Sequence, residues 1–141
     1  KDYEITDFDD IETLYFKYSI VYSQLLLENL PAILSNNFSV VPQLGEPTYY
    51  KKRSPQDGYI DWELMDVLEI YNLVRATTRP YPGAFAEVDA NMIRIWRCRP
   101  FDSRIIYSNF RYGEIVEHFG GRLLINCRGG VLLVDEWERF K

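Results

Sequence analysis

The stretch Arg53–Phe85, RSPQDGYIDWELMDVLEIYNLVRATTRPYPGAF, determines how the rest of the chain is arranged. Pro55–Gly58 is typical of a tight turn, because proline presets one φ angle and Asp-Gly tolerates the corner positions. We expect a helix to begin at Asp61, whose carboxylate would cap the free amides of the first turn. The helix should end before Pro80, since the residue preceding a proline is pushed out of the helical region. Tyr81–Gly83 would then form a stiff corner that leads into a strand.

This helix should carry one apolar stripe, because its apolar residues recur at three- and four-residue spacing. The stripe is expected to hold Leu64, Val67, Leu68, Tyr71 and Val74, widened by Trp62, Met65 and Ile70. We expect Trp62 in particular to be an anchor of the core.

The remainder of the chain, after the corner, reads as strands. The expected strands are Ala84–Val88, Asn91–Arg99, Gly113–Phe119, Arg122–Cys127 and Val131–Glu136. Glycine pairs at 120–121 and 129–130 are typical of hairpin turns, which need positive φ. Five short strands after a helix predict an α+β fold with a small OB-like β barrel.

The residues that precede this stretch predict a helix followed by a linker. Asp2–Ile5 could be the end of a strand, and a helix should run from about Asp10 to Leu34, where Pro31 would kink or restart it. Its apolar residues are too many for a lone arm to bury, so another part of a protein should cover them. Residues 36–61 read as a linker, with a short strand at Thr48–Lys51. The helix-and-barrel domain would then be residues 62–141.

Composition excludes several classes of protein. The net charge of −5 over 141 residues argues against general nucleic-acid affinity. Two cysteines and one histidine give no metal-site spacing, and the cysteines are expected to be buried free thiols. We see no signal peptide and no apolar run long enough to cross a membrane, so a cytoplasmic location is expected. The chain starts with Lys1 and not with methionine, and within an expected element, so we expect a fragment of a longer protein.

The ordered residues Arg53–Trp62, Val74–Ala76 and Arg79–Phe85 resemble the linker and C-terminal domain of the folate-dependent N-formyltransferases. That family includes methionyl-tRNA formyltransferase and the enzymes that formylate nucleotide-linked amino sugars. Pro80–Phe85 is closer in form to the sugar branch. The resemblance implies an OB-like C-terminal domain, and it implies that residues 1–35 are the last strand and helix of a truncated N-terminal catalytic domain.

The resemblance also implies formyl transfer from 10-formyltetrahydrofolate to an amine, by an Asn-His-Asp set in the N-terminal domain. The chain has no Asn-X-His, and its one histidine, His118, lies in an expected hairpin. No catalytic residue is therefore assigned here, the folate is expected in the missing domain, and no metal is expected.

Four residues are candidates for binding the acceptor: Arg53, Asp57, Arg79 and Tyr81. In the family, the linker would line the acceptor side of the cleft, with Arg53 near a phosphate; Arg79 and Tyr81 could hold a nucleotide by charge and stacking. The structural alternatives are that Asp57 only shapes the turn and that Arg79 only complements a helix C-terminus. Arginine and aromatic residues also alternate at Trp96–Arg99, as on nucleic-acid-binding sheets or on an ordinary exposed strand.

Three functions follow as alternatives. The chain could be the non-catalytic C-terminal part of a formyltransferase acting on a nucleotide-linked amino sugar. It could be the tRNA-binding part of a methionyl-tRNA formyltransferase, with initiator tRNA as partner. It could also be a stand-alone OB-like module for binding or dimerisation. The expected partners are the catalytic domain or, through the apolar helix, a second copy of the chain.

Overall fold

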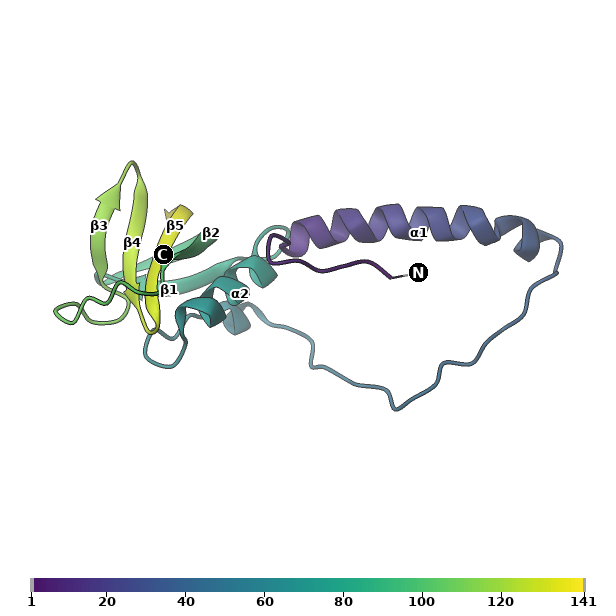
Figure 1. Cartoon of the computed structure of the whole chain (residues 1–141), viewed down its shortest axis with the longest axis horizontal. Coiled ribbons are helices and arrows are strands. Elements are labelled where there is room, and N and C mark those ends of the chain that lie inside the picture. The colour runs from purple at the N-terminus through teal and green to yellow at the C-terminus, as the bar shows by residue number, and fades with distance from the viewer. Residues whose placement is uncertain (1, 141) are drawn as a thin grey trace.

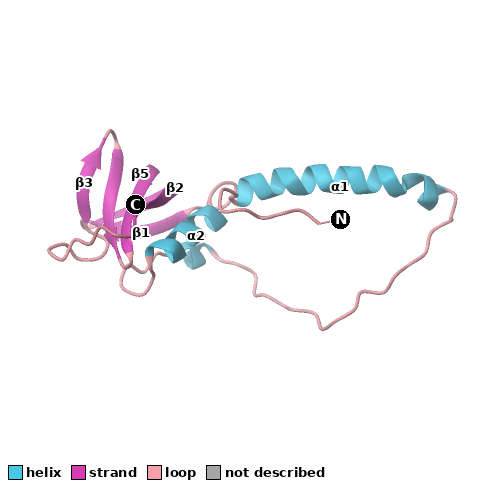
Figure 2. Cartoon of the chain, viewed as in Figure 1, coloured by secondary structure: helices cyan, strands magenta, loops and turns pink. Residues whose placement is uncertain are grey.

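The structure, a computed structural model, describes residues 2–140. Helix α1 (Ile11–Leu34) is followed by a long extended segment, a short 3-10 turn η1 (Pro55–Gly58) and helix α2 (Val67–Thr77). The strands are β1 (Ala84–Val88), β2 (Asn91–Asp102), β3 (Ile115–Phe119), β4 (Arg122–Cys127) and β5 (Gly130–Arg139). Helix α2 packs on the sheet at one end of the molecule, while α1 and the extended segment project from it (Figure 1, Figure 2).

The strands form one antiparallel sheet in the order β1-β2-β5-β4-β3. This confirms an α+β fold with five strands after a helix. The expected barrel does not close, because β1 and β3 are opposite edges and no ladder joins them among the described residues. The linker covers part of the β1 edge instead: the amide of Ile60 donates to the carbonyl oxygen of Phe85 at 2.8 Å.

The core lies between α2 and one face of the sheet. Ile60, Ile70, Ile95 and Ile125 are fully buried, and Trp62 is 9% exposed, which confirms it as a core residue. The indole Nε1 of Trp62 donates to the carbonyl oxygen of Glu87 at 3.0 Å, so its polar group is satisfied inside the core.

Helix α2 begins later than expected. Asp61 does accept from the amides of Glu63 and Leu64, but this closes only a turn. The helix N-cap is Asp66, which accepts from the amides of Leu68 and Glu69, while the Glu69 carboxylate accepts from the Asp66 amide. The amide of Val67 donates to the carbonyl oxygen of Arg128 at 2.9 Å, so a contact with the β4–β5 turn fixes the start of the helix.

The later start changes the apolar stripe. Val67, Ile70 and Val74 are buried, as expected, but Leu64 is 72% exposed and Leu68 is 57% exposed. Leu64 precedes the helix, and Leu68 lies about 100° around it from Val67, off the face that packs on the sheet. These two assignments to the core were wrong.

Several strand boundaries agree with the sequence. β1 and β4 match their predicted bounds, and Gly120 and Gly121 both have positive φ in the β3–β4 turn. The β4–β5 turn is shifted by one residue, because Cys127 pairs with Gly130 and places Arg128-Gly129 at its corner. The strands expected at Asp2–Ile5 and Thr48–Lys51 are extended segments, because no described segment pairs with them.

Helix α1 has no buried residue. It is 24 residues long and continues through Pro31 to Leu34 without a break. Its exposed apolar side chains include Phe16, Ile20, Leu26, Leu27 and Leu34.

Candidate functional site

An open cleft of about 560 Å³ lies where the start of α1, the end of the linker and the exit of α2 meet. Figure 1 shows these three segments converging beside α2. The cleft is lined by Ile11, Lys52, Arg53, Ser54, Pro55, Asp57, Gly58, Ala76, Thr77, Tyr81, Pro82 and Gly83. Residues from both ends of the stretch 53–85 therefore line one hollow.

The linker side of the cleft is shaped by Asp57. Its carboxylate accepts from the amide of Ser54 at 2.6 Å and from the Ser54 hydroxyl at 3.2 Å. The Ser54 amide is also the main cause that lowers the pKa of Asp57, with smaller contributions from the charges of Arg53 and Lys51. Asp57 thus lines the cleft, and its carboxylate holds the η1 turn. Shaping this turn is the structural role that the sequence offered as the alternative to binding the acceptor.

Lys52 and Arg53 place positive charge on the same side. Both lie in the extended linker directly before η1, and both side chains are exposed. A guanidinium and an ammonium beside an open cleft can bind a phosphate or a carboxylate. Arg53 was predicted from the family motif, and the basic run Lys51–Arg53 is a signal in the sequence that also indicates Lys52.

The opposite side is the corner after α2. Thr78 is buried and donates from its hydroxyl to the Trp96 carbonyl oxygen at 2.9 Å, which fixes the corner to β2. The Arg79–Pro80 peptide bond is cis. The amide of Gly83 donates to Thr77 O at 2.8 Å, and this closes the turn that presents Tyr81 to the cleft.

Tyr81 joins the corner to α1. Its hydroxyl lies 2.7 Å from the hydroxyl of Tyr15, and the two ring centroids are 6.4 Å apart. The hydrogen bond to Tyr81 raises the pKa of Tyr15. Tyr81 is 43% exposed, so its ring remains accessible from the cleft.

Arg79 does not line the cleft. Its guanidinium forms an ion pair with Glu136 at 2.7 Å and lies over the Trp96 ring, 4.4 Å from the centroid. The structure therefore brings together Arg53, Asp57 and Tyr81 and places Arg79 on the sheet. The ion pair with Glu136 is not visible in the sequence, because the two residues are far apart in the chain.

Trp96 is enclosed by arginines on the sheet surface. Arg79 lies 4.4 Å and Arg94 5.4 Å from its ring centroid. Arg94 also pairs with Glu138 at 2.9 Å and lies 4.5 Å from the Phe140 ring centroid. These contacts favour the structural interpretation of the Trp96–Arg99 pattern over a surface on which bases stack.

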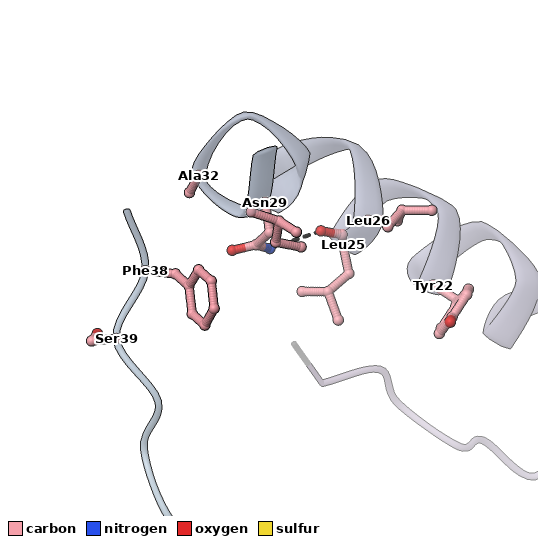
Figure 3. Close-up of a pocket in the computed structure, with 8 residues that line it drawn as sticks. Tyr22, Leu25, Leu26, Asn29, Ala32, Phe38 and Ser39 are labelled. Atoms are coloured by element: carbon pink, nitrogen blue, oxygen red, sulfur yellow. Dashed lines mark hydrogen bonds between the residues drawn. The ribbon is translucent and has the colours of Figure 1, made fainter. Parts of the chain in front are cut away.

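A second hollow lies along the distal half of α1 (Figure 3). It measures about 390 Å³, and Phe38 lies across from Leu25 and Ala32. The side-chain amide of Asn29 donates to the Leu25 carbonyl oxygen at 2.7 Å, which holds this side chain against the helix. The hollow is mainly apolar and continues the exposed surface of α1.

The described residues contain no group of His, Cys, Asp and Glu side chains able to hold a metal ion. His118 is exposed in β3, and Cys98 and Cys127 are buried free thiols. Burial raises the pKa of Cys127 to about 12 and raises that of Cys98 further, so neither thiol is a nucleophile at neutral pH. Neither α1 nor α2 combines the length and apolarity of a membrane-spanning helix.

The described residues form an antiparallel sheet covered by helix α2, with an open cleft where the linker meets the corner after this helix. Residues 52–140 match the family described as the formyl transferase C-terminal domain, and the chain belongs to that family.

Known proteins resemble the chain over most of its length. The bifunctional polymyxin resistance protein ArnA of Wigglesworthia glossinidia brevipalpis is 32% identical over 126 residues, which are 89% of this chain and 18% of ArnA. A multiply substituted HypX from Aquifex aeolicus shares the fold, with a TM-score of 0.80 and 18% identity over 99% of this chain and 24% of HypX. HypX in complex with tetrahydrofolic acid gives a TM-score of 0.67 and 21% identity over 84% of this chain and 20% of HypX. The chain thus spans about a fifth of these relatives.

Proposed function

We propose that the chain is the linker and C-terminal part of a formyltransferase that moves a formyl group from 10-formyltetrahydrofolate to the amine of a nucleotide-linked amino sugar. Membership of the formyl transferase C-terminal domain family is the observation that carries this proposal. The likeness to ArnA over 89% of the chain supports it, as does the Pro80–Phe85 form of the corner. In this proposal residues 1–35 belong with the catalytic domain, residues 36–61 are the linker and residues 62–141 are the C-terminal domain.

The surface charge favours a small acceptor over tRNA. Arg79, Arg94, Arg99, Arg104, Arg111 and Arg122 all form ion pairs with carboxylates of the same domain. Arginines neutralised in this way contribute little to the release of counterions on which tRNA affinity depends. The net charge of −5 acts in the same direction.

The cleft would receive the phosphate-bearing part of the acceptor. Lys52 and Arg53 would bind the phosphates, since the guanidinium can form paired hydrogen bonds with phosphate oxygens. Tyr81 would contact the nucleotide or sugar from the opposite side. Asp57 would act indirectly, by keeping η1 in the shape that presents Arg53.

The folate would bind elsewhere in the parent enzyme. HypX has been solved with tetrahydrofolic acid, which supports a folate as the formyl donor for this family. The described residues do not fit a folate site: the one buried polar side-chain atom without a partner among them, Arg94 Nε, is not part of the cleft. We therefore assign no chemical step to this chain. The apolar side chains of α1 would pack on the catalytic domain.

An acceptor panel tests this function. The complete gene product that carries this chain is incubated with 10-formyltetrahydrofolate and, in turn, a nucleotide-linked amino sugar and methionyl-tRNA. We expect a formylated sugar, no formylated tRNA, and no product with the present chain alone. Formylation of methionyl-tRNA, or turnover by residues 1–141 alone, would contradict the proposal.

A further inference from the structure

Helix α2 holds the chain segment that precedes α1. Arg75 donates from one terminal nitrogen of its guanidinium to the carbonyl oxygens of Thr6 and Asp9, each at 2.9 Å. One turn earlier on the same helix, the Tyr71 hydroxyl donates to the carbonyl oxygen of Asp7 at 2.6 Å. Two side chains of α2 thus bind three backbone carbonyl oxygens, those of Thr6, Asp7 and Asp9.

Arg75 is preorganised for this contact. Its Nε donates to the side-chain oxygen of Asn72 at 2.9 Å, and its guanidinium carbon lies 5.3 Å from the Tyr71 ring centroid. These contacts fix the guanidinium before it meets the carbonyls, so less side-chain entropy is lost when the contact forms.

The bound segment is also preorganised, by Asp9. The Asp9 carboxylate is buried and accepts from the amide and hydroxyl of Thr6, at 2.7 and 2.9 Å, and from Lys17 Nζ at 2.6 Å. The carboxylate thus bonds within its own turn, where the Asp9 amide also donates to the Thr6 carbonyl oxygen at 3.2 Å, and the carbonyl oxygens of Thr6 and Asp9 both accept from α2. Because Arg75 and Tyr71 contact only backbone carbonyl oxygens, the contact depends on the shape of the turn and not on the identity of its side chains.

We propose that Arg75, supported by Tyr71, is a positioning residue that sets the orientation of α1 relative to the C-terminal domain. Ile11, two residues after Asp9, is a wall of the cleft, and Tyr15 one turn later meets Tyr81. The contacts of Arg75 and Tyr71 with residues 6–9 therefore also fix the width of the cleft. This inference concerns the chain itself and does not depend on which acceptor the parent enzyme uses.

The test measures the distance between α1 and the sheet domain by pulsed electron spin resonance. Spin labels are attached at Ser23→Cys on α1 and Ser108→Cys in the β2–β3 loop, both exposed positions. Cys98 and Cys127 are buried and do not compete for the label. The wild-type chain should give one narrow distance distribution.

Arg75→Ala should broaden this distribution at least twofold, and Arg75→Lys should restore part of the narrowing because an ammonium can still donate to a carbonyl. Arg122→Ala is the matched control, since Arg122 in β4 pairs with Asp135 in β5, away from α1 (Figure 1) and from the labelled loop, and should leave the distribution narrow. Circular dichroism establishes that each variant is folded. If Arg75→Ala fails to fold, Tyr71→Phe decides, because it removes only the hydroxyl and should also broaden the distribution. A folded Arg75→Ala variant with the wild-type distribution would overturn the proposal. If Arg75→Ala does not fold, a wild-type distribution in Tyr71→Phe would overturn it.

Discussion

Gly58 lies directly against Gly83: a Cβ atom built on Gly58 would stand 2.8 Å from the Gly83 carbonyl oxygen. The two glycines come from near opposite ends of the stretch 53–85, and both line the cleft. The neighbouring backbone bond from the Ile60 amide to Phe85 O, 2.8 Å long, holds the linker at this distance. The approach is possible because Gly58 carries no side chain; a Cβ on Gly83 would instead meet the side chains of Arg94 and Trp96.

We expect Gly58→Ala to lower the free energy of unfolding by about 1–3 kcal/mol, the usual cost of overpacking a tight contact. Urea denaturation measures this change. Gly120→Ala is the comparison, because a Cβ there meets nothing within 4 Å and the substitution costs only the strain of its positive φ. Equal stability of Gly58→Ala and the wild type would show that the linker does not dock on the corner.

Trp62 should be the most costly side chain to remove near the linker. It is 9% exposed, its Nε1 donates to Glu87 O, and its ring lies so close to Gly113 that a Cβ there would be 2.5 Å from Trp62 Cδ1. We expect Trp62→Ala to destabilise the chain by about 3–5 kcal/mol in thermal or urea unfolding. Leu68→Ala, on the exposed side of α2, should change stability by less than about 0.5 kcal/mol. If Leu68→Ala destabilised the chain more than Trp62→Ala, the assignment of Leu68 to the exposed side of α2 and of Trp62 to the core would be wrong.

Asn126 should hold the loop between β2 and β3. Its side chain is buried and donates from Nδ2 to the carbonyl oxygens of Phe110 at 2.8 Å and Tyr107 at 3.3 Å. Asn126→Ala leaves these carbonyls without their donor, at a cost of about 1–3 kcal/mol. Hydrogen exchange of residues 107–114 should accelerate in this variant and not in Asn109→Ala, whose side chain is exposed in the same loop. Unchanged exchange in Asn126→Ala would show that the loop is held by other contacts.

Asp9 should remain ionised in acid. The hydrogen bond from Lys17, followed by that from the Thr6 amide, lowers the pKa of Asp9 well below the ordinary aspartate value of 3.8. A lowered pKa in the folded state means that the carboxylate stabilises the fold above pH 3.8, and that this contribution is lost as the pH falls through the lowered pKa. Carbon-detected NMR titration should therefore show Asp9 still charged at pH 3.8.

The Lys17→Ala variant is the control for this titration. Without the ammonium, the pKa of Asp9 should rise toward 3.8. A midpoint at or above 3.8 in the unsubstituted chain would contradict the geometry of the residue 6–13 turn.

Local patterns were sufficient to predict the five strands of the sheet and part of the core face of α2, but not the exposure of Leu64 and Leu68. The bounds predicted for β1 and β4 are those observed, and the apolar spacing placed Val67 and Val74 in the core. The helix start was wrong because Asp61 and Asp66 are both good N-caps, and only the distant contact from Val67 to Arg128 O selects the second. Barrel closure was wrong because local sequence does not determine which edge strands meet.

Three of the four candidate residues line the cleft, and their role in binding an acceptor stays a prediction. Arg53 and Asp57 follow from the family motif, and Tyr81 follows from the corner. Ile11 and Ala76 could not be predicted, because they reach the cleft only through the packing of α1 near α2. Arg79 was placed in the site for its charge, but its partner Glu136 comes from the last strand.

The most direct test of the cleft as the acceptor side is the steady-state kinetics of Arg53→Ala in the complete enzyme, with Arg79→Ala as the matched control. Loss of a charge-assisted hydrogen bond of about 1.5–3 kcal/mol should raise KM for the nucleotide-linked amino sugar by roughly tenfold to a hundredfold, with little change in kcat. Arg79→Ala, which removes an arginine outside the cleft, should leave KM near the wild-type value. A wild-type KM in Arg53→Ala, or an equal rise in both variants, would contradict the assignment.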